Sequence, residues 1–301
     1  MYEGPVIDAH HHLWDYGSGR HPWLSPGGGP ASLGDLAYLR RDYLPDDFAR
    51  DCDGQNLAAS ILVEALWDPA RDPYEEVEWL DSLPRVGGIA SRYVAFANLA
   101  APDAGTRVKR LAGNPRVAGV RQTLRWHPDP ARCWSDRRLA GDPAWRRGVG
   151  LLRDAGLVLE ILTYPWQAGD VSRLAQDMPG LTIVVDHCSS PIDRDAAGVE
   201  RWRQGLAAMA DASNVHLKLS NFVNYVAGHS VEAAAAVILP CIDAFGAGRC
   251  LFGSDFPVAR RAMPYSGMCR LFRAAIAGLP TADQRSILFA NAVRLYGLHF
   301  D

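Results

Sequence analysis

The chain has 301 residues, of which 48% are hydrophobic and 22% are charged, a balance typical of a folded globular protein. The formal net charge of -3 provides no basic surface for nucleic acid or anionic lipid, and no apolar run approaches the ~20 residues of a membrane span. Six cysteines occur without a C-x-x-C pair, and no basic segment followed by an apolar one opens the chain. We therefore expect reduced thiols and a cytoplasmic location.

Short apolar runs rich in β-branched residues recur along the chain. They occupy residues 6–12, 60–65, 93–99, 117–124, 157–163, 181–187, 215–220 and 250–256. Runs of this length that are almost continuously apolar are typical of parallel strands covered on both faces. The sequence therefore predicts eight buried parallel strands.

Longer amphipathic stretches separate most of these runs, and they predict helices at 73–83, 145–155, 199–212, 230–245 and 281–296. Asp142 and Pro143 form a capping start for the second helix, and Gly156 is a stop signal. Eight repeats of strand and helix favour an α/β fold, a single (β/α)₈ barrel domain over residues 1–301. A doubly wound sheet would need a glycine-rich turn after the first strand, where this chain has His-x-His. The long connection at 14–56 is predicted to be a lid-like insertion or a small extra helix.

Ligand-type residues lie at the ends of the predicted strands. His10 and His12 end the first strand, Asp186 and His187 the sixth, and Asp255 the eighth. Because the carboxyl ends of barrel strands meet at one rim, these side chains are expected to converge there. Residues two apart on a strand share a face, so the two imidazoles of the first strand form a platform for a divalent metal.

The sequence resembles the amidohydrolase superfamily, specifically the amidohydrolase-2 group that includes sugar-acid lactonases and 2-pyrone-4,6-dicarboxylate lactonase. The resemblance covers nearly the whole chain. It is carried by IDAHHHLWD at 7–15, HPWL at 21–24, DHCSSP at 186–191, VHLKLS at 215–220, FGSDFPV at 252–258 and ANAVRLYGL at 290–298.

The resemblance implies that His10, His12, His187 and Asp255 occupy metal-binding or catalytic positions. Many superfamily members also have a histidine on the fifth strand or a lysine on the fourth, and this chain has neither. A single Zn²⁺ on His10, His12 and Asp255, completed by His187 or Glu160, is therefore favoured over a binuclear centre. Catalysis without a metal, with the histidines donating hydrogen bonds, is the alternative.

The implied activity is hydrolysis of a small lactone, with a sugar-acid lactone of carbohydrate catabolism favoured and a muconolactone or pyrone type next. Asp255 is the predicted general base, and His187 or a metal polarises the carbonyl. A small molecule is thus the expected partner, with predicted substrate contacts from Arg121, Arg125, Trp14, Trp126 and Lys218. A metal-dependent decarboxylase and a non-catalytic binding barrel are the alternatives.

Overall fold

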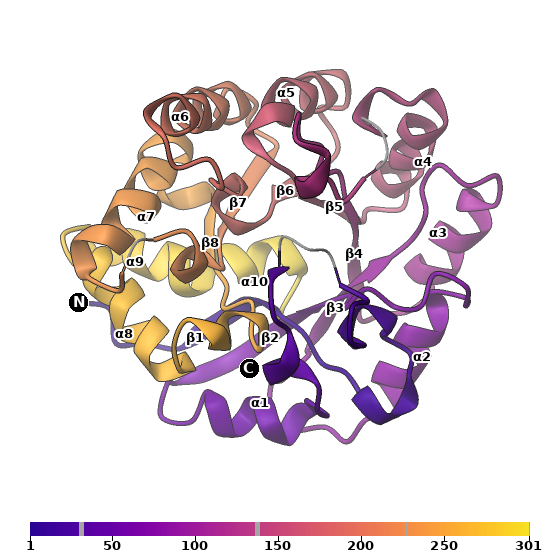
Figure 1. Ribbon diagram of the computed structural model, residues 1–301, viewed down its shortest axis with the longest axis horizontal. Coiled ribbons are helices and arrows are strands. Elements are labelled where there is room, and N and C mark those ends of the chain that lie inside the picture. Colours follow the sequence, from indigo (N-terminus) through magenta and orange to yellow (C-terminus); the bar gives the residue numbers. More distant parts are fainter. Residues whose placement is uncertain (30–32, 136–138, 227, 301) are drawn as a thin grey trace.

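The computed structural model describes residues 1–29, 33–135, 139–226 and 228–300, and eight parallel strands form its centre (Figure 1). The strands are β1 (Val6–His11), β2 (Leu57–Val63), β3 (Arg92–Phe96), β4 (Val117–Thr123), β5 (Val158–Leu162), β6 (Ile183–Val185), β7 (Val215–Leu219) and β8 (Cys250–Phe252). They pair in chain order, and a parallel bridge between His11 and Phe256 joins the end of β1 to the segment that follows β8. The predicted (β/α)₈ barrel is confirmed.

The strands end earlier than the apolar runs suggested. β6 ends at Val185 and β8 at Phe252, so His187 and Asp255 lie in the loops that follow. Both residues have a positive φ, 56° and 59°, which is incompatible with extended backbone. His187 and Asp255 therefore follow their strands, whereas His10 lies within β1 and His12 comes directly after it.

Helices surround the barrel as a ring. They are α1 (Pro45–Asp51), α2 (Tyr74–Ser82), α3 (Ala104–Ala112), α4 (Pro143–Asp154), α5 (Ala168–Asp177), α6 (Ala196–Ala210), α7 (Val231–Phe245), α8 (Tyr265–Ala275), α9 (Thr281–Arg285) and α10 (Asn291–Tyr296). The five helices expected from periodicity are present. The last is divided into α9 and α10 by a π-helical turn at Ser286–Ala290.

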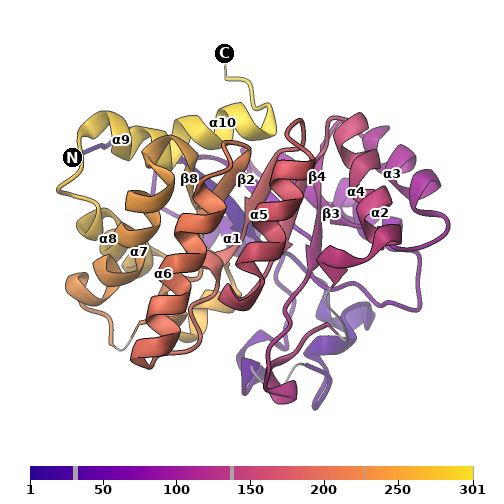
Figure 2. The same ribbon diagram turned by 90° about the horizontal axis from the view of Figure 1, so that it is seen from above.

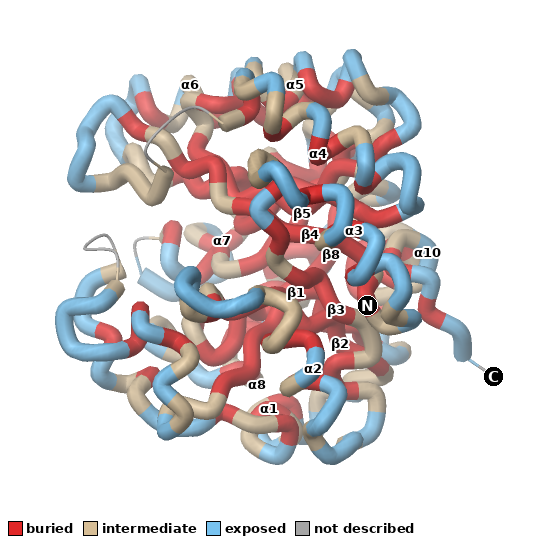
Figure 3. The backbone as a smooth tube through the Cα atoms, turned by 90° about the vertical axis from the view of Figure 1, so that its right-hand side faces the viewer, coloured by how far each residue is buried: buried red, intermediate tan, exposed pale blue. Residues whose placement is uncertain are grey.

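The core has two parts. A large apolar cluster lies between the strands and the surrounding helices, and the strands are buried along their length (Figure 3). A smaller cluster joins strand residues such as Ile61 and Leu251 to Tyr296 of α10. In Figure 2, α10 covers one end of the barrel, while the loops that follow β1 and β4 project from the other end. The functional rim is therefore the end opposite α10.

In its described residues the connection at 14–56 contains α1 and three short 3₁₀ turns, and an antiparallel bridge joins Trp14 to Tyr43. Residues 30–32 of this connection lie outside the described residues. Trp23 and Leu33 line a pocket at the functional rim, which accords with the predicted lid; the lid role itself stays a prediction. Among the helices of the described residues, none combines the length and apolar character needed to cross a membrane.

Candidate active site

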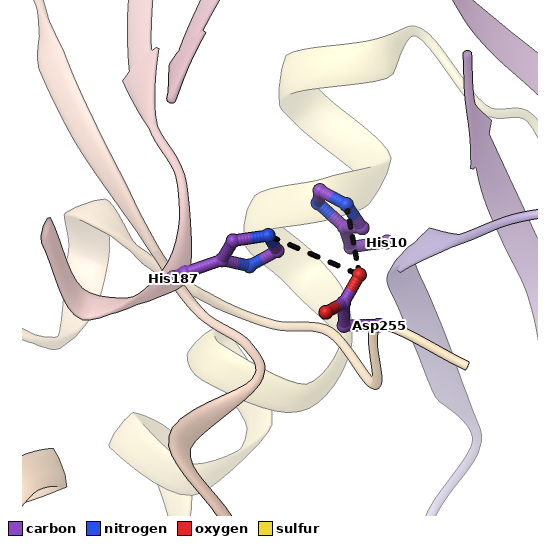
Figure 4. Close-up of side chains that lie close together, drawn as sticks. All are labelled: His10, His187 and Asp255. Carbon is purple, nitrogen blue, oxygen red and sulfur yellow. Dashed lines mark ion pairs between the residues drawn. The ribbon is translucent and has the colours of Figure 1, made fainter. Parts of the chain in front are cut away.

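Three histidines and one carboxylate converge at the functional rim, and Figure 4 shows two of the histidines, His10 and His187, beside Asp255. Oδ1 of Asp255 lies 3.1 Å from Nε2 of His12, 3.6 Å from Nε2 of His10 and 3.9 Å from Nε2 of His187. All four residues are at least 95% buried. The structure thus brings together, around a single oxygen, four residues that are up to 245 positions apart in the chain.

Hydrogen bonds to backbone groups connect the strand that carries His10 to the loop that carries Asp255. The Asp8 carboxylate accepts from the backbone N–H groups of His10 and Ser254, at 3.0 and 2.8 Å. The N–H of Asp255 donates to the carbonyl of His10 at 2.7 Å. Asp8 is fully buried and also accepts from the hydroxyl of Tyr265 on α8. Because these bonds connect β1 to the loop after β8, they set the position of Asp255 relative to His10 and His12.

A strained turn positions the third histidine. The four residues from His187 to Ser190 all have φ between 47° and 59°, the left-handed region that costs about 1–2 kcal/mol per non-glycine residue. The indole of Trp202 on α6 donates to the carbonyl of Cys188 at 2.7 Å and holds the turn against the barrel. This backbone directs His187 toward Asp255, and strain of this kind is typical of functional sites.

The hydrogen bonds of the imidazoles define which nitrogens face Asp255. Nδ1 of His12 donates to the carbonyl of Val63 at 2.8 Å, because a carbonyl oxygen can only accept. Neutral His12 therefore presents a bare Nε2 lone pair to the carboxylate of Asp255. Two acceptors 3.1 Å apart repel each other unless a proton or a metal ion lies between them.

The electrostatics of the cluster favour a neutral His10, a neutral His187 and an ionised Asp255. Burial lowers the pKa of His10 well below its usual value, and the Lys218 ammonium lowers it further. Burial likewise lowers the pKa of His187. Burial alone would raise the pKa of Asp255, but its interactions with His187 and with its other neighbours reverse that effect and lower it.

This donor set fits a zinc ion. Neutral imidazole nitrogens and a carboxylate oxygen are ligands that Zn²⁺ takes in catalytic sites. His10, His187 and Asp255 each offer a ligand atom within 4.8 Å of the other two. With metal–ligand bonds of about 2.0–2.1 Å, the ligands of a tetrahedral ion lie about 3.3 Å apart, close to the separations between Asp255 and the histidines.

Beneath the histidines lies a buried charge network that ends in α10. The ammonium of Lys218 lies 2.5 Å from Oε2 of Glu160, 3.8 Å from Oδ1 of Asp186 and 3.5 Å from Nδ1 of His10. The hydroxyl of Tyr296 donates to the other oxygen of Glu160. Asp186 in turn lies 3.4 Å from Nδ1 of His10, so this carboxylate can orient the imidazole that faces Asp255.

An arginine connects this network to a pair of buried acids. Arg121 donates to a carboxylate oxygen and to the carbonyl of Glu64, at 2.8 and 2.7 Å, and its Nη1 lies 3.8 Å from Asp186. Oε1 of Glu76 on α2 accepts from the N–H of Ala65 at 2.8 Å. Arg121 therefore faces two buried acids, Glu64 and Asp186, and the Glu64 carboxylate also acts on the charge of Glu76.

Replacing Glu76 by Gln is expected to remove a pH dependence of stability. Burial, assisted by the Glu64 carboxylate, raises the pKa of Glu76 to about 8, against an ordinary value of 4.5. Between pH 4.5 and about 8, Glu76 is ionised in the unfolded chain but stays protonated in the folded chain. The free energy of unfolding of the wild type should therefore fall, relative to Glu76→Gln, as the pH rises through the interval. Urea unfolding of both proteins from about pH 5 to 9 measures this, and a difference that does not change with pH would contradict it.

A pocket opens above the cluster. Its lining contains His12, His187 and Asp255 together with two of the predicted substrate-contacting residues, Arg121 and Arg125. A wider cleft continues outward from it, and Arg125 borders both. His12, His187 and Asp255 thus face a space that a small molecule can enter, whereas His10 is fully buried and does not line it.

The other predicted contact residues lie elsewhere. Among the described residues that line the pocket and the cleft, Trp14, Trp126, Lys218 and Glu160 are absent. Trp14 is fully buried, and its indole donates to the carbonyl of Arg41. Glu160 faces Lys218 below the histidines. Their predicted roles toward substrate or metal stay predictions.

Sequence reasoning missed several residues that support the site. Glu64 follows a buried strand directly, so its position carried the same signal as the residues that were found. Tyr296, Tyr225 and Ser190 gave no such signal, because their roles depend on contacts between distant segments. Asp8 lies inside the first apolar run, and a buried carboxylate there was a sign that a polar partner must exist.

Comparison with known proteins identifies the family of this chain. A sequence profile of the amidohydrolase family matches residues 7–298, and the chain belongs to that family. The chain is thus a hydrolase enzyme with a barrel scaffold.

Two relatives come from Burkholderia multivorans. An L-fucono-1,5-lactonase is 29% identical over 303 residues, covering 97% of this chain and 96% of its own. A crystal structure of an amidohydrolase with bound zinc is 28% identical and superposes with a TM-score of 0.80, covering 98% of this chain and 100% of its own. A 2-pyrone-4,6-dicarboxylic acid hydrolase from Pseudomonas putida, described as putative, shares the fold at 19% identity and a TM-score of 0.73, covering 99% of each chain.

Proposed function

We propose that this amidohydrolase opens the ring ester of a small lactone by attack of a water molecule. The observation that carries the proposal is the convergence of three imidazole nitrogens on one oxygen of Asp255, at the floor of a pocket. The relative that is an L-fucono-1,5-lactonase supports the choice of a lactone, and a sugar-acid lactone is the favoured substrate.

Asp255 acts as the general base in this mechanism. Its carboxylate accepts a proton from the attacking water, and the same proton is then delivered to the ring oxygen when the ester bond breaks. The lowered pKa keeps Asp255 ionised near neutral pH and also makes it a weak base. The site must therefore polarise the lactone carbonyl strongly.

Positive charge and hydrogen-bond donors around the pocket supply part of that polarisation. The Arg121 guanidinium lines the pocket, and its Nη1 lies 3.5 Å from Nε2 of His10. His187 faces the same space, and its Nδ1 is held by the hydroxyl of Ser220 at 2.8 Å. Donors fixed before the substrate arrives stabilise a developing oxyanion without reorganisation.

We further propose that His10, His12, His187 and Asp255 hold one Zn²⁺. When bound, the ion would polarise the carbonyl and lower the pKa of water to about 7. The bare Nε2 of His12 opposite Asp255 supports this assignment, because a metal would relieve the repulsion between the two acceptors. Asp186 would then orient His10 from behind.

The test combines a substrate panel with metal analysis. Proton release is followed on aldonolactones and muconolactone-type lactones, and zinc content is measured before and after chelation. We expect turnover of at least one lactone, about one zinc per chain, and activity that chelation removes and zinc restores. Full activity in the metal-depleted protein would overturn the zinc assignment, and the histidines would then act as donors. Carbon dioxide release without lactone opening would replace the proposed function by decarboxylation.

A further inference from the structure

Arg125 carries a buried positive charge that the described residues do not neutralise. Its side chain follows β4 and is 94% buried. Its two hydrogen bonds are both donated by Nη2, to the hydroxyl of Ser190 at 2.9 Å and to that of Tyr225 at 3.4 Å. Nε is buried without any hydrogen-bond partner. Among the described residues, no carboxylate forms an ion pair with this guanidinium.

Aromatic faces hold the guanidinium in place. Its central carbon lies 4.5 Å from the ring centre of Trp134 and 5.0 Å from that of Tyr164. These contacts stabilise a cation by less than the cost of burying an unpaired charge. An arrangement of this kind orients a charge without compensating it. A planar anion that binds to Arg125 would supply the missing negative charge.

The position of Arg125 relates this charge to the reaction. It lines the inner pocket together with Asp255 and His187, and it also lines the outer cleft. The cleft contains two further arginines, Arg194 and Arg261, that form no ion pair with any described residue. A molecule with its lactone carbonyl above Asp255 would therefore extend its far end toward positive charge.

We infer that Arg125 binds a carboxylate of the substrate, so that the enzyme acts on lactones whose ring substituent ends in a carboxylate. The inference rests on the proposed function and narrows its substrate class to the lactones of sugar diacids and of unsaturated dicarboxylic acids. Because Nη2 already donates to Ser190 and Tyr225, a carboxylate would accept from Nη1, which forms no hydrogen bond with any described residue, while the contacts with Trp134 and Tyr164 hold the guanidinium in place.

A matched pair of substrates tests the inference. D-glucaro-1,4-lactone and D-glucono-1,4-lactone share a ring and differ in whether the substituent ends in a carboxylate or a hydroxymethyl group. We expect kcat/KM to be about 10- to 100-fold higher for the glucarolactone, the worth of one charged hydrogen-bonded contact. Equal kcat/KM for the two lactones would overturn the inference. So would a preference for 6-phosphogluconolactone over the glucarolactone, because that would assign the subsite to phosphate.

Substitutions test whether Arg125 causes the preference for the glucarolactone. Arg125→Gln should reduce the ratio of the two kcat/KM values to about 1, with the loss confined to the glucarolactone, and Arg125→Lys should retain part of it. Arg203→Gln, an exposed site on α6, removes the same charge and should leave the ratio unchanged. Equal losses on both lactones in Arg125→Gln would show a structural role and overturn the inference.

Binding measurements separate this inference from the proposed function, because they require no turnover. Calorimetry should show that wild-type protein binds D-glucarate more tightly than D-gluconate, and that Arg125→Gln abolishes the difference. If neither lactone is opened but this difference is found, the proposed function fails and the subsite stands. If lactones are opened and the difference is absent, the subsite fails and the function stands.

Discussion

Replacing Asp255 by Asn should lower kcat/KM by about 10³-fold or more while the fold is retained. A positioned base contributes about 10²–10⁴-fold, and the amide cannot accept the proton of the attacking water. The same change removes the negative charge that three imidazole nitrogens face, so the predicted zinc site should weaken as well. Hydrolysis rates and zinc content of the purified variant measure the two effects.

Asp243→Asn provides the matched control for this variant. Asp243 is exposed on α7 and lines neither the pocket nor the cleft, and the substitution makes the same chemical change. Its rate and zinc content should equal those of the wild type. Asp255→Asn with unchanged activity and ligand affinity would exclude Asp255 as the base and favour a non-catalytic binding barrel.

Replacing Lys218 by Met should destabilise the protein by about 3–5 kcal/mol, because it leaves Glu160 and Asp186 as buried acids without their ammonium partner. Burial raises the pKa of Glu160, which the Lys218 charge counteracts. Without the Lys218 ammonium, the Asp186 carboxylate should also lose a contact that holds it beside Nδ1 of His10. Urea unfolding measures the stability, and zinc affinity measures the effect on His10.

A double variant separates the charge network from simple packing. In Lys218→Met combined with Glu160→Gln, one buried acid is removed together with its partner. The destabilisation should therefore be smaller than the sum of the two single effects, by about 1–3 kcal/mol. Additive losses would show that Lys218 and Glu160 act independently, and the account of a coupled network beneath the histidines would be wrong.

The barrel was predictable because its signal is local. Eight apolar runs each carry the composition of a buried parallel strand, and the positions of His10, His12, His187 and Asp255 at their ends follow from the rule that barrel sites lie at the carboxyl ends of strands. The limits of β6 and β8 were wrong by two to four residues. The left-handed backbone at His187 and Asp255 depends on contacts such as Trp202 with Cys188, which no local pattern encodes.

The supporting interactions were beyond the reach of sequence patterns for a related reason. Tyr296 reaches Glu160 across 136 positions of the chain, and Arg125 meets Tyr225 across 100. Such pairs form because α10 covers one end of the barrel and the rim loops gather at the other. Lys218 shows the same limit: its strand-end position could not indicate the two buried carboxylates that it lies against, and its predicted substrate contact stays a prediction.

The most direct test of the account follows the origin of the oxygen that enters the product. A single turnover of a lactone substrate in water enriched with oxygen-18 should place the label in the new carboxylate of the product during that first turnover. This is the signature of direct attack of water on the lactone carbonyl, the step for which Asp255 is proposed as the base. An unlabelled first product, with the label appearing later in the side chain of Asp255, would show that the carboxylate attacks directly and would contradict the mechanism proposed for this site.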